Sequence, residues 1–237
     1  MQDRYAGDFG DYIKISLLRS LSVGRTLGVA WYLYPNENHN SDGRHTKYLS
    51  MPNHWRKLDP GLFDDLRRIV YSGRSVRSLQ CNLATNTLFM SVPIPTNLPS
   101  HARSTARQSW FDQVVERLAN CGLLFADPDN GLVDDQDFRR RSLIFGKQIP
   151  VTEARTLSQG RCVVLYHHNS RFKGGHDAEV DHWLRAIGLP TLAVRATAYG
   201  CRTFFIVNPD AEIVVRTQEF CKRWENHKVR LHRAWIA

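Results

Sequence analysis

The sequence predicts an α/β fold built on a largely parallel sheet. Short apolar runs, such as residues 123–126, alternate along the chain with longer segments whose apolar residues recur at helical spacing. This alternation is typical of parallel strands joined by crossover helices. The 237 residues show no internal repeat, low-complexity tract or clear linker. We therefore expect one Rossmann-like domain over residues 1–237, which closes on a C-terminal antiparallel hairpin.

The first half of the chain is expected to begin with an amphipathic helix. Asp8 and Asp11 precede residues 12–21, where isoleucine and leucine recur at helical spacing, and Gly24 follows as a stop. The other elements expected before residue 93 are a strand at 27–33, a polar loop at 35–45, a helix at 60–70, and short strands at 76–79 and 87–92.

Proline interrupts the pattern after residue 92. Residues 93–107 contain three prolines and are expected to form a flexible loop. Beyond this loop the sequence predicts helices at 108–119, 151–157, 177–187 and 212–225, strands at 123–126 and 161–166, and a terminal hairpin of 191–195 with 202–207.

The charge of the chain favours a polyanionic partner. Lys and Arg number 32 against 23 Asp and Glu, a net charge of +9, and arginine dominates the excess. Such a surface favours phosphate, so we expect the protein to bind RNA or DNA. The first residues lack the pattern of a signal peptide, and there is no apolar run of about 18 residues. From this we expect a cytoplasmic protein with no membrane partner.

Four polar blocks stand at the predicted ends of elements. They are residues 7–14, the loop 36–45, residues 127–131 and residues 166–171. In an open α/β sheet, ligands bind beyond the carboxyl ends of the strands. We therefore expect the four blocks to share one face and to form an active site.

The block Asp127-Pro128-Asp129-Asn130 allows three interpretations. Carboxylate and carbonyl oxygens after a strand can accept the hydrogens of an exocyclic base amine and orient its nitrogen toward a methyl donor. Alternatively, Asp127 and Asp129 with a histidine such as His167 hold Mg²⁺ or Mn²⁺ for phosphodiester hydrolysis, since hard cations prefer oxygen ligands. In the third interpretation the block is a tight turn, because Asp-Pro and Asn-Gly are ordinary turn pairs.

Histidines provide further candidates. His167 and His168 are adjacent at the end of a strand, so we expect at most one of them to face a site. His176, Glu179 and His182 lie three residues apart and would share one face of a helix, which suggests a metal site. The His-Glu-x-x-His spacing of many zinc sites is missing.

Aromatic and basic residues suggest contacts with nucleic acid. Tyr34 and its aromatic neighbours stack a base in one interpretation and pack in the core in the other. The strongest basic run is Arg139, Arg140 and Arg141, which with Arg171 either contacts phosphates or forms a solvated loop.

Several segments resemble one family in the same order along the chain. Ala6-Gly-Asp-Phe-Gly-Asp-Tyr-Ile-Lys14 is similar to the Ala-Gly-Asn-His-Ala-Asp-x-x-Lys segment of the bacterial large-subunit rRNA adenine-N6 methyltransferases and, more loosely, of the three-Cys-motif partner proteins. Leu124-Phe-Ala-Asp127-Pro128 stands where that family has Asp-Pro-Pro-Tyr. Val164-Leu-Tyr-His-His168 resembles its strand ending in Trp-Tyr-Pro, and Phe205-Ile-Val-Asn-Pro209 its closing Val-Asn-Pro strand.

The resemblance implies a class I methyltransferase sheet, S-adenosylmethionine as cofactor and adenine in RNA or DNA as substrate. It implies that Asp127 and the Pro128 carbonyl hold the target amine and that Lys14 lies near the cofactor or substrate. The residues expected to bind the cofactor are Asp8, Asp11, Tyr34, Asp42 and Gly43.

Two positions depart from the family pattern. Its first strand ends in Ala-Gly-x-Gly, whereas here no glycine follows the strand before Gly43. Asp129-Asn130 replaces Pro-Tyr, so Tyr34 or Tyr166 would have to stack the target base. Two alternatives therefore stand beside a methyltransferase: a metal-dependent nuclease that uses the Asp and His cluster, and a non-catalytic module that binds nucleic acid or protein.

Overall fold

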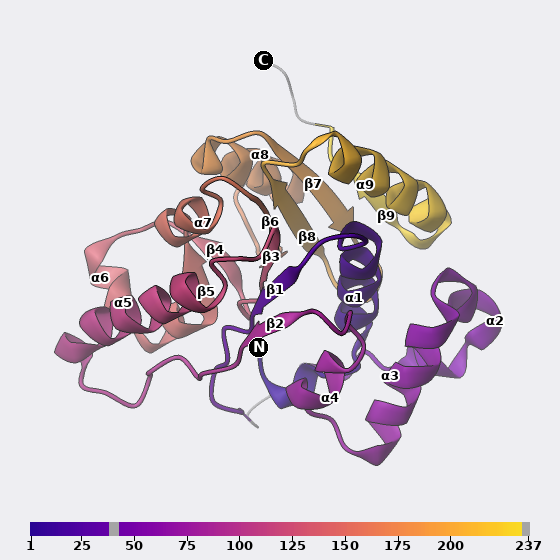
Figure 1. Ribbon diagram of the computed structural model, residues 1–237, viewed down its shortest axis with the longest axis horizontal. Coiled ribbons are helices and arrows are strands. Elements are labelled where there is room, and N and C mark those ends of the chain that lie inside the picture. Colours follow the sequence, from indigo (N-terminus) through magenta and orange to yellow (C-terminus); the bar gives the residue numbers. More distant parts are fainter. Residues whose placement is uncertain (38–42, 234–237) are drawn as a thin grey trace.

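Seven strands form the central sheet of the computed structural model, which describes residues 1–37 and 43–233 (Figure 1). Their order across the sheet is β2-β1-β3-β6-β8-β7-β9. The bounds are β1 (Leu27–Ala30), β2 (Leu88–Met90), β3 (Leu123–Ala126), β6 (Cys162–His168), β7 (Thr191–Ala196), β8 (Arg202–Val207) and β9 (Val229–Leu231). Neighbours from β2 to β6 are parallel, and β8 is antiparallel to both β6 and β7. The predicted α/β class is confirmed, as is the antiparallel hairpin near the C-terminus.

Helices cover both faces of this sheet. The helices of the described chain are α1 (Phe9–Leu21), α2 (Pro52–Trp55), α3 (Pro60–Ser72), α4 (Val76–Gln80), α5 (Ser100–Arg117), α6 (Asp137–Arg140), α7 (Val151–Leu157), α8 (Gly175–Ile187) and α9 (Ala211–Trp224). Leu123 and Phe125 of β3 pack with α1, α3 and α9, whereas Leu124 and Ala126 pack with α5, α7 and α8. Because both faces are buried, the strand reads as an uninterrupted apolar run.

The start of α1 is fixed by local hydrogen bonds. Asp8 is the N-cap, and its side chain accepts a hydrogen bond from the Asp11 backbone N–H at 3.2 Å. The Asp11 carboxylate in turn accepts from the Gly7 N–H at 2.9 Å. Gly7 has a φ of +83°, and a Cβ there would lie 2.6 Å from a methyl carbon of Val70. Only glycine fits this position, so the first block of polar residues is tied to α3.

Two predictions about local structure are wrong. Residues 76–79 are not a strand but part of helix α4, because the Ser75 side chain caps it by accepting from the Ser78 N–H at 3.1 Å. Residues 100–107, expected in a flexible loop, form the first turns of α5. Arg107 holds them in place through a buried ion pair with Glu153.

A small second sheet was not predicted. Strands β4 (Gly131–Val133) and β5 (Gln148–Pro150) pair in parallel, and α6 and the 3-10 helix η4 (Leu143–Lys147) lie between them in the chain. Strand β9 was also not predicted. Within the described residues, no helix is long and apolar enough to cross a membrane.

Candidate functional site

A cavity of about 260 Å³ lies at the carboxyl ends of β3 and β6. The chain leaves β1 for β2 on one side, and β3 then pairs with β1 on the other, so the strand order reverses between β1 and β3, beside this cavity. Such a reversal leaves a crevice between adjacent carboxyl ends, where α/β proteins bind ligands. All four polar blocks contribute to the cavity. Its lining includes Asp8, Asp11, Lys14, Gly43, His45, Asp127, Pro128, Asp129, Asn130, Tyr166, His168, Tyr199, Gly200 and Arg202.

A buried lysine between two carboxylates forms the floor of this cavity. The Lys14 Nζ donates to Asp11 Oδ1 at 2.8 Å and to Asp127 Oδ2 at 2.7 Å, although the two aspartates are far apart in sequence. Burial alone would lower the pKa of Lys14, but the two carboxylates outweigh it and raise the pKa above its ordinary value. Burial raises the pKa of Asp127, which Lys14 only partly offsets.

A second cluster of acceptors surrounds the amino group of Met1. This group donates to the Tyr32 carbonyl at 2.6 Å and to the Asp127 carbonyl at 3.3 Å, and it pairs with Asp129 Oδ1 at 2.5 Å. Asp129 Oδ2 also accepts from Gln2 Nε2 at 2.6 Å. The carboxyl ends of β1 and β3 therefore present acceptors that suit an ammonium group.

Gly131 and His167 explain why the Asp-Pro-Asp-Asn block ends in glycine. Gly131 has a φ of +93°, and a Cβ there would lie 2.6 Å from the His167 Cα. The Leu132 N–H donates to His167 Nδ1 at 3.0 Å, which ties β4 to β6. The residues before Gly131, from Asp127 to Asn130, line the cavity.

The two adjacent histidines point to opposite faces, as alternation along a strand predicts. His168 lines the cavity, and its Nδ1 lies 3.3 Å from the Tyr166 hydroxyl. His167 is buried on the other side of the sheet, where its Nε2 lies 3.2 Å from Glu179 Oε1. His167 therefore does not join Asp127 and Asp129 as a third metal ligand.

Glu179 is likewise occupied by structural hydrogen bonds. Its carboxylate accepts from Asn169 Nδ2 at 3.0 Å and from the Ser170 hydroxyl at 2.7 Å, besides His167. Its hydrogen-bond partners in the described chain are therefore His167, Asn169 and Ser170 rather than His176 or His182. In the part of the chain that the structure describes, no group of three His, Cys, Asp or Glu residues is arranged to hold a metal ion.

We expect Glu179 to make the folded protein sensitive to acid. Burial alone would raise its pKa, but the hydrogen bonds from His167, Ser170 and Asn169 outweigh it and lower the pKa to about 2. A carboxylate whose pKa is lowered by folding adds stability above its unfolded pKa and loses it as the pH falls through the folded one. The contribution is at most about 3 kcal/mol, lost between about pH 4.5 and pH 2.

The measurement is urea unfolding of the wild-type protein and Glu179→Gln at several pH values. The variant should be less stable near neutral pH, and the gap should narrow as the pH falls from about 5 to 2. A gap that stays constant over this range would show that the charge of Glu179 does not matter.

The hairpin turn between β7 and β8 supplies cavity residues that the sequence analysis missed. Tyr199, Gly200 and Arg202 lie there because His168 and Arg202 are paired across β6 and β8, at the same edge of the sheet. The Arg202 guanidinium donates to the carbonyls of Ala198 at 3.3 Å and Tyr199 at 3.0 Å, which holds the turn. The sequence carried a signal for this position. The short Ala-Tyr-Gly-Cys turn joins two predicted antiparallel strands, so it lies at one edge of the sheet.

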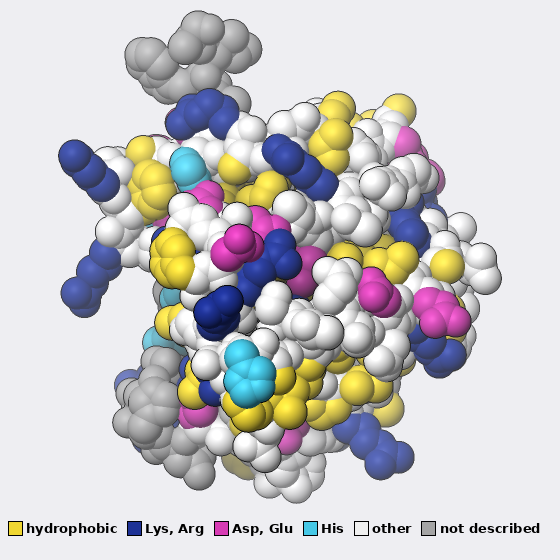
Figure 2. All heavy atoms as spheres, turned by 90° about the vertical axis from the view of Figure 1, so that its left-hand side faces the viewer, with side chains coloured by type: hydrophobic (Ala, Val, Ile, Leu, Met, Phe, Trp, Pro, Cys, Tyr) yellow, Lys and Arg dark blue, Asp and Glu magenta, His cyan; other side chains and the backbone are white. Residues whose placement is uncertain are grey.

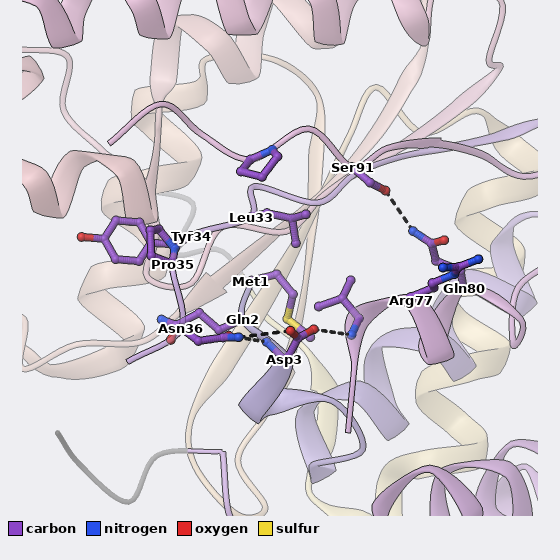
Figure 3. A pocket seen from close by; sticks show the side chains of 12 residues that line it. Met1, Gln2, Asp3, Leu33, Tyr34, Pro35, Asn36, Arg77, Gln80 and Ser91 are labelled. Atoms are coloured by element: carbon purple, nitrogen blue, oxygen red, sulfur yellow. Dashed lines mark hydrogen bonds between the residues drawn. The ribbon is translucent and has the colours of Figure 1, made fainter. Parts of the chain in front are cut away.

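A second cavity, of about 530 Å³, adjoins the first through Met1 (Figure 3). Leu33 and Met1 lie between Tyr34, Pro35 and Asn36 on one side and Arg77, Gln80 and Ser91 on the other. The polar groups in its walls pair with each other: Asn36 Nδ2 donates to Asp3 Oδ2 at 3.1 Å, and Gln80 Nε2 donates to Ser91 Oγ at 2.9 Å.

The residues expected to bind a cofactor are divided between the two cavities. Tyr34 lines the second cavity, with its ring 4.8 Å from Lys147 Nζ, whereas Tyr166 lines the first. Asp8, Asp11 and Gly43 line the first cavity. Asp42 lies outside the described residues.

The predicted phosphate-binding arginines lie on the surface rather than in either cavity. Arg139 and Arg140 belong to α6, Arg141 follows it, and Arg171 is exposed in the loop before α8. Arg140 is ion-paired with Asp135 at 2.6 Å.

Fold and site together define a Rossmann-like α/β domain with a charged cavity at the carboxyl ends of β3 and β6, beside the point where the strand order reverses. A comparison with protein-family models finds no match for this chain, and a comparison with curated proteins finds none either.

Proposed function

We propose that this protein is a class I methyltransferase-like enzyme that uses S-adenosylmethionine to methylate an exocyclic amine of a nucleic-acid base. One observation carries the proposal: the carboxyl ends of β1 and β3 present an ammonium site beside the buried carboxylate of Asp127. An amino-acid cofactor and a base amine both need such acceptors, and here they lie at one edge of the sheet.

The residues present fit the cofactor at two points. The Tyr32 carbonyl, the Asp127 carbonyl and the Asp129 carboxylate would hold its α-ammonium, in the place that the Met1 amino group takes here. The adjoining cavity has apolar side chains such as Leu33 and Val76 in its walls, which suit a nucleoside. The segment after β1 forms this wall with side chains, where the resembling family has glycines.

The chain's own residues supply the acceptor side of the reaction. The cofactor, when bound, provides an electrophilic methyl group. Asp127, held by Lys14 through Oδ2, accepts a hydrogen of the target amine, and the Pro128 carbonyl accepts the other, so that the nitrogen lone pair is directed at the methyl group. As the N–C bond formed, the bond between the methyl group and the cofactor sulfur would break and leave a neutral thioether; the amine would lose a proton, and the raised pKa of Asp127 would favour its transfer to this carboxylate.

Of the two aromatic residues considered for stacking the target base, Tyr166 lies nearer to Asp127 because it lines the same cavity. It lines the same cavity as Asp127, and the Lys14 Nζ lies 5.4 Å from its centroid. Tyr34, the other aromatic residue considered, lines the neighbouring cavity. Stacking on a tyrosine would hold a flipped base with its amine toward Asp127.

Calorimetric titration with S-adenosylmethionine and transfer of labelled methyl groups to RNA and DNA test the proposal. We expect saturable binding to the wild-type protein. Asp129→Asn should weaken it about tenfold, because a charge-assisted hydrogen bond becomes a neutral one. Asp127→Asn should keep cofactor binding within about threefold and lower methyl transfer about 100-fold, since the acceptor that acts on the amine loses its charge.

Asp134→Asn serves as the control, because Asp134 lies beyond β4 and its side chain is about half exposed, at 48%. It should behave as wild type. Absence of saturable cofactor binding, or methyl transfer that Asp127→Asn leaves unchanged, would refute the proposal. Cleavage of nucleic acid that EDTA abolishes, without cofactor binding, would instead support the metal-dependent alternative.

A further inference from the structure

We propose that the protein binds an unpaired strand of nucleic acid on a surface beside the cavity, which we call the α6 surface. It consists of Phe138, Leu143 and Ile144 together with Arg103, Arg139 and Arg141. The inference rests on the proposed function for the class of partner, but its test needs neither the cofactor nor methyl transfer.

Apolar side chains gather here to an extent not seen elsewhere in the described residues. Phe138 is 72% exposed, Leu143 47% and Ile144 54%, all within one short stretch. The other large exposed apolar side chains are dispersed along the described chain; they are Val23, Met51, Tyr71, Val92, Leu189 and Val215. Clustered apolar side chains at a surface usually mark a binding site.

The same stretch carries arginines that no carboxylate neutralises within the described part of the chain. The Arg139 guanidinium lies 5.5 Å from the centroid of the Phe138 ring, and its Nε donates to the neutral Gln136 side chain. Arg103 Nη1 donates to the Arg141 carbonyl at 2.8 Å, which places α5 beside α6. Figure 2 views the molecule from the side of α5, α6 and α7, where Lys and Arg side chains lie among apolar and acidic ones.

The α6 surface is joined to the rim of the cavity at both ends. Residue 131, where β4 begins, directly follows Asn130, which lines the cavity. The return segment η4 ends at Lys147, whose carbonyl accepts from the Asn130 N–H at 2.8 Å. Arg107 also holds this segment, because its guanidinium donates to the carbonyls of Phe145 at 3.4 Å and Gln148 at 3.0 Å. A strand bound here would lie next to the cavity.

An unpaired strand fits this chemistry better than a duplex or a protein. An exposed ring with a guanidinium over it offers a stacking platform, and bases present their faces only where the strand is unpaired. Guanidinium groups whose charge no carboxylate balances attract phosphates of the backbone. Arg140 is left out of the α6 surface, since Asp135 and Asp137 already balance its charge.

Fluorescence anisotropy with a labelled single-stranded RNA and the matching DNA, measured over a range of KCl concentrations, tests the inference. The wild-type protein should bind with a strong salt dependence. The triple variant Arg103→Gln, Arg139→Gln, Arg141→Gln should lower the slope of log K against log salt by about 2, at roughly 0.7 per lost phosphate contact. Phe138→Ala should weaken binding about 5- to 100-fold and leave the slope unchanged, as loss of stacking predicts.

Matched controls come from α3, which lies across the molecule from α6 (Figure 1). Tyr71 is 79% exposed and follows Arg67 and Arg68, so it is an exposed aromatic residue beside arginines. Tyr71→Ala and Arg67→Gln, Arg68→Gln should bind as wild type. Absence of salt-sensitive binding, or binding that the α6-surface variants leave unchanged, would overturn the inference. If cofactor binding and methyl transfer persisted in that case, the proposed function would still stand.

Discussion

Lys14→Met is expected to destabilise the folded protein by about 3–5 kcal/mol near neutral pH, since breaking a buried ion pair leaves an uncompensated charge. Lys14 is 4% exposed and is the cation that Asp11 and Asp127 share. Without it, two buried carboxylates would face each other. For a chain of this size the thermal midpoint should fall by about 6–20 °C.

The pH dependence separates this charge effect from a packing defect. Without Lys14, the pKa values of Asp11 and Asp127 rise further in the folded state, so the folded state takes up protons more readily than the unfolded chain. The destabilisation should therefore shrink as the pH falls through these raised values. Urea unfolding of the variant at neutral and acidic pH measures it.

Two further variants complete this experiment. Adding Asp127→Asn to Lys14→Met removes one of the unpaired charges and should recover part of the lost stability. Lys222→Met makes the same substitution at an exposed position of α9 and should change stability by less than about 0.5 kcal/mol. If Lys14→Met were as stable as Lys222→Met, the ion pair would not be a structural element of the fold.

Arg107→Met is expected to cost a similar amount, about 3–5 kcal/mol, for the same reason. Arg107 Nε and Nη2 donate to the two oxygens of Glu153 at 2.9 and 2.8 Å, a bidentate pair. The Tyr32 hydroxyl also donates to Glu153 at 3.0 Å, and the guanidinium lies 5.1 Å from the centroid of the Tyr32 ring. Loss of Arg107 would leave the carboxylate of Glu153 buried with one neutral donor.

Thermal and urea unfolding of Arg107→Met, Glu153→Met and the double variant test this expectation. The double variant should lose less stability than the sum of the losses of the two single variants, because no unpaired charge remains in it. Arg56→Met removes an arginine from an exposed pair with Asp64 and should leave the stability close to that of the wild type. Strict additivity of the two single variants would contradict the coupling.

Local signals in the sequence were sufficient to predict most strands of the sheet and most of the helices. Residues 123–126 form β3 as predicted, because a short run of apolar residues between turn residues can only be buried on both faces. Asp8 caps α1, and residues 191–195 and 202–207 form the hairpin. The prediction of a strand at residues 76–79 was wrong, because the serine cap favours a helix more than so short a segment favours a strand.

The candidate site was predictable in part. Three of the four polar blocks meet because they follow strands that end at one edge of the sheet, and the fourth, residues 7–14, joins them at the start of α1. The positions of individual residues were not predictable. His167 is buried on the face of the sheet opposite to the cavity, whereas His168 lines the cavity. Arg202 reaches the cavity from the start of β8. Strand alternation indicates that the two histidines differ, but only the packing of Glu179 decides which one is buried.

The sequence by itself determined the α/β class, the positions of most helices and strands, and the polar residues at the strand ends, because these depend on neighbours within a few positions. Only the tertiary structure decided that Lys14 pairs with Asp127 and Arg107 with Glu153, and that residues 100–107 are helical. These contacts join segments far apart in the chain. Burial decides which charged residues pair, because a charge removed from water needs an opposite charge nearby, and only the packing of the core determines which one is near.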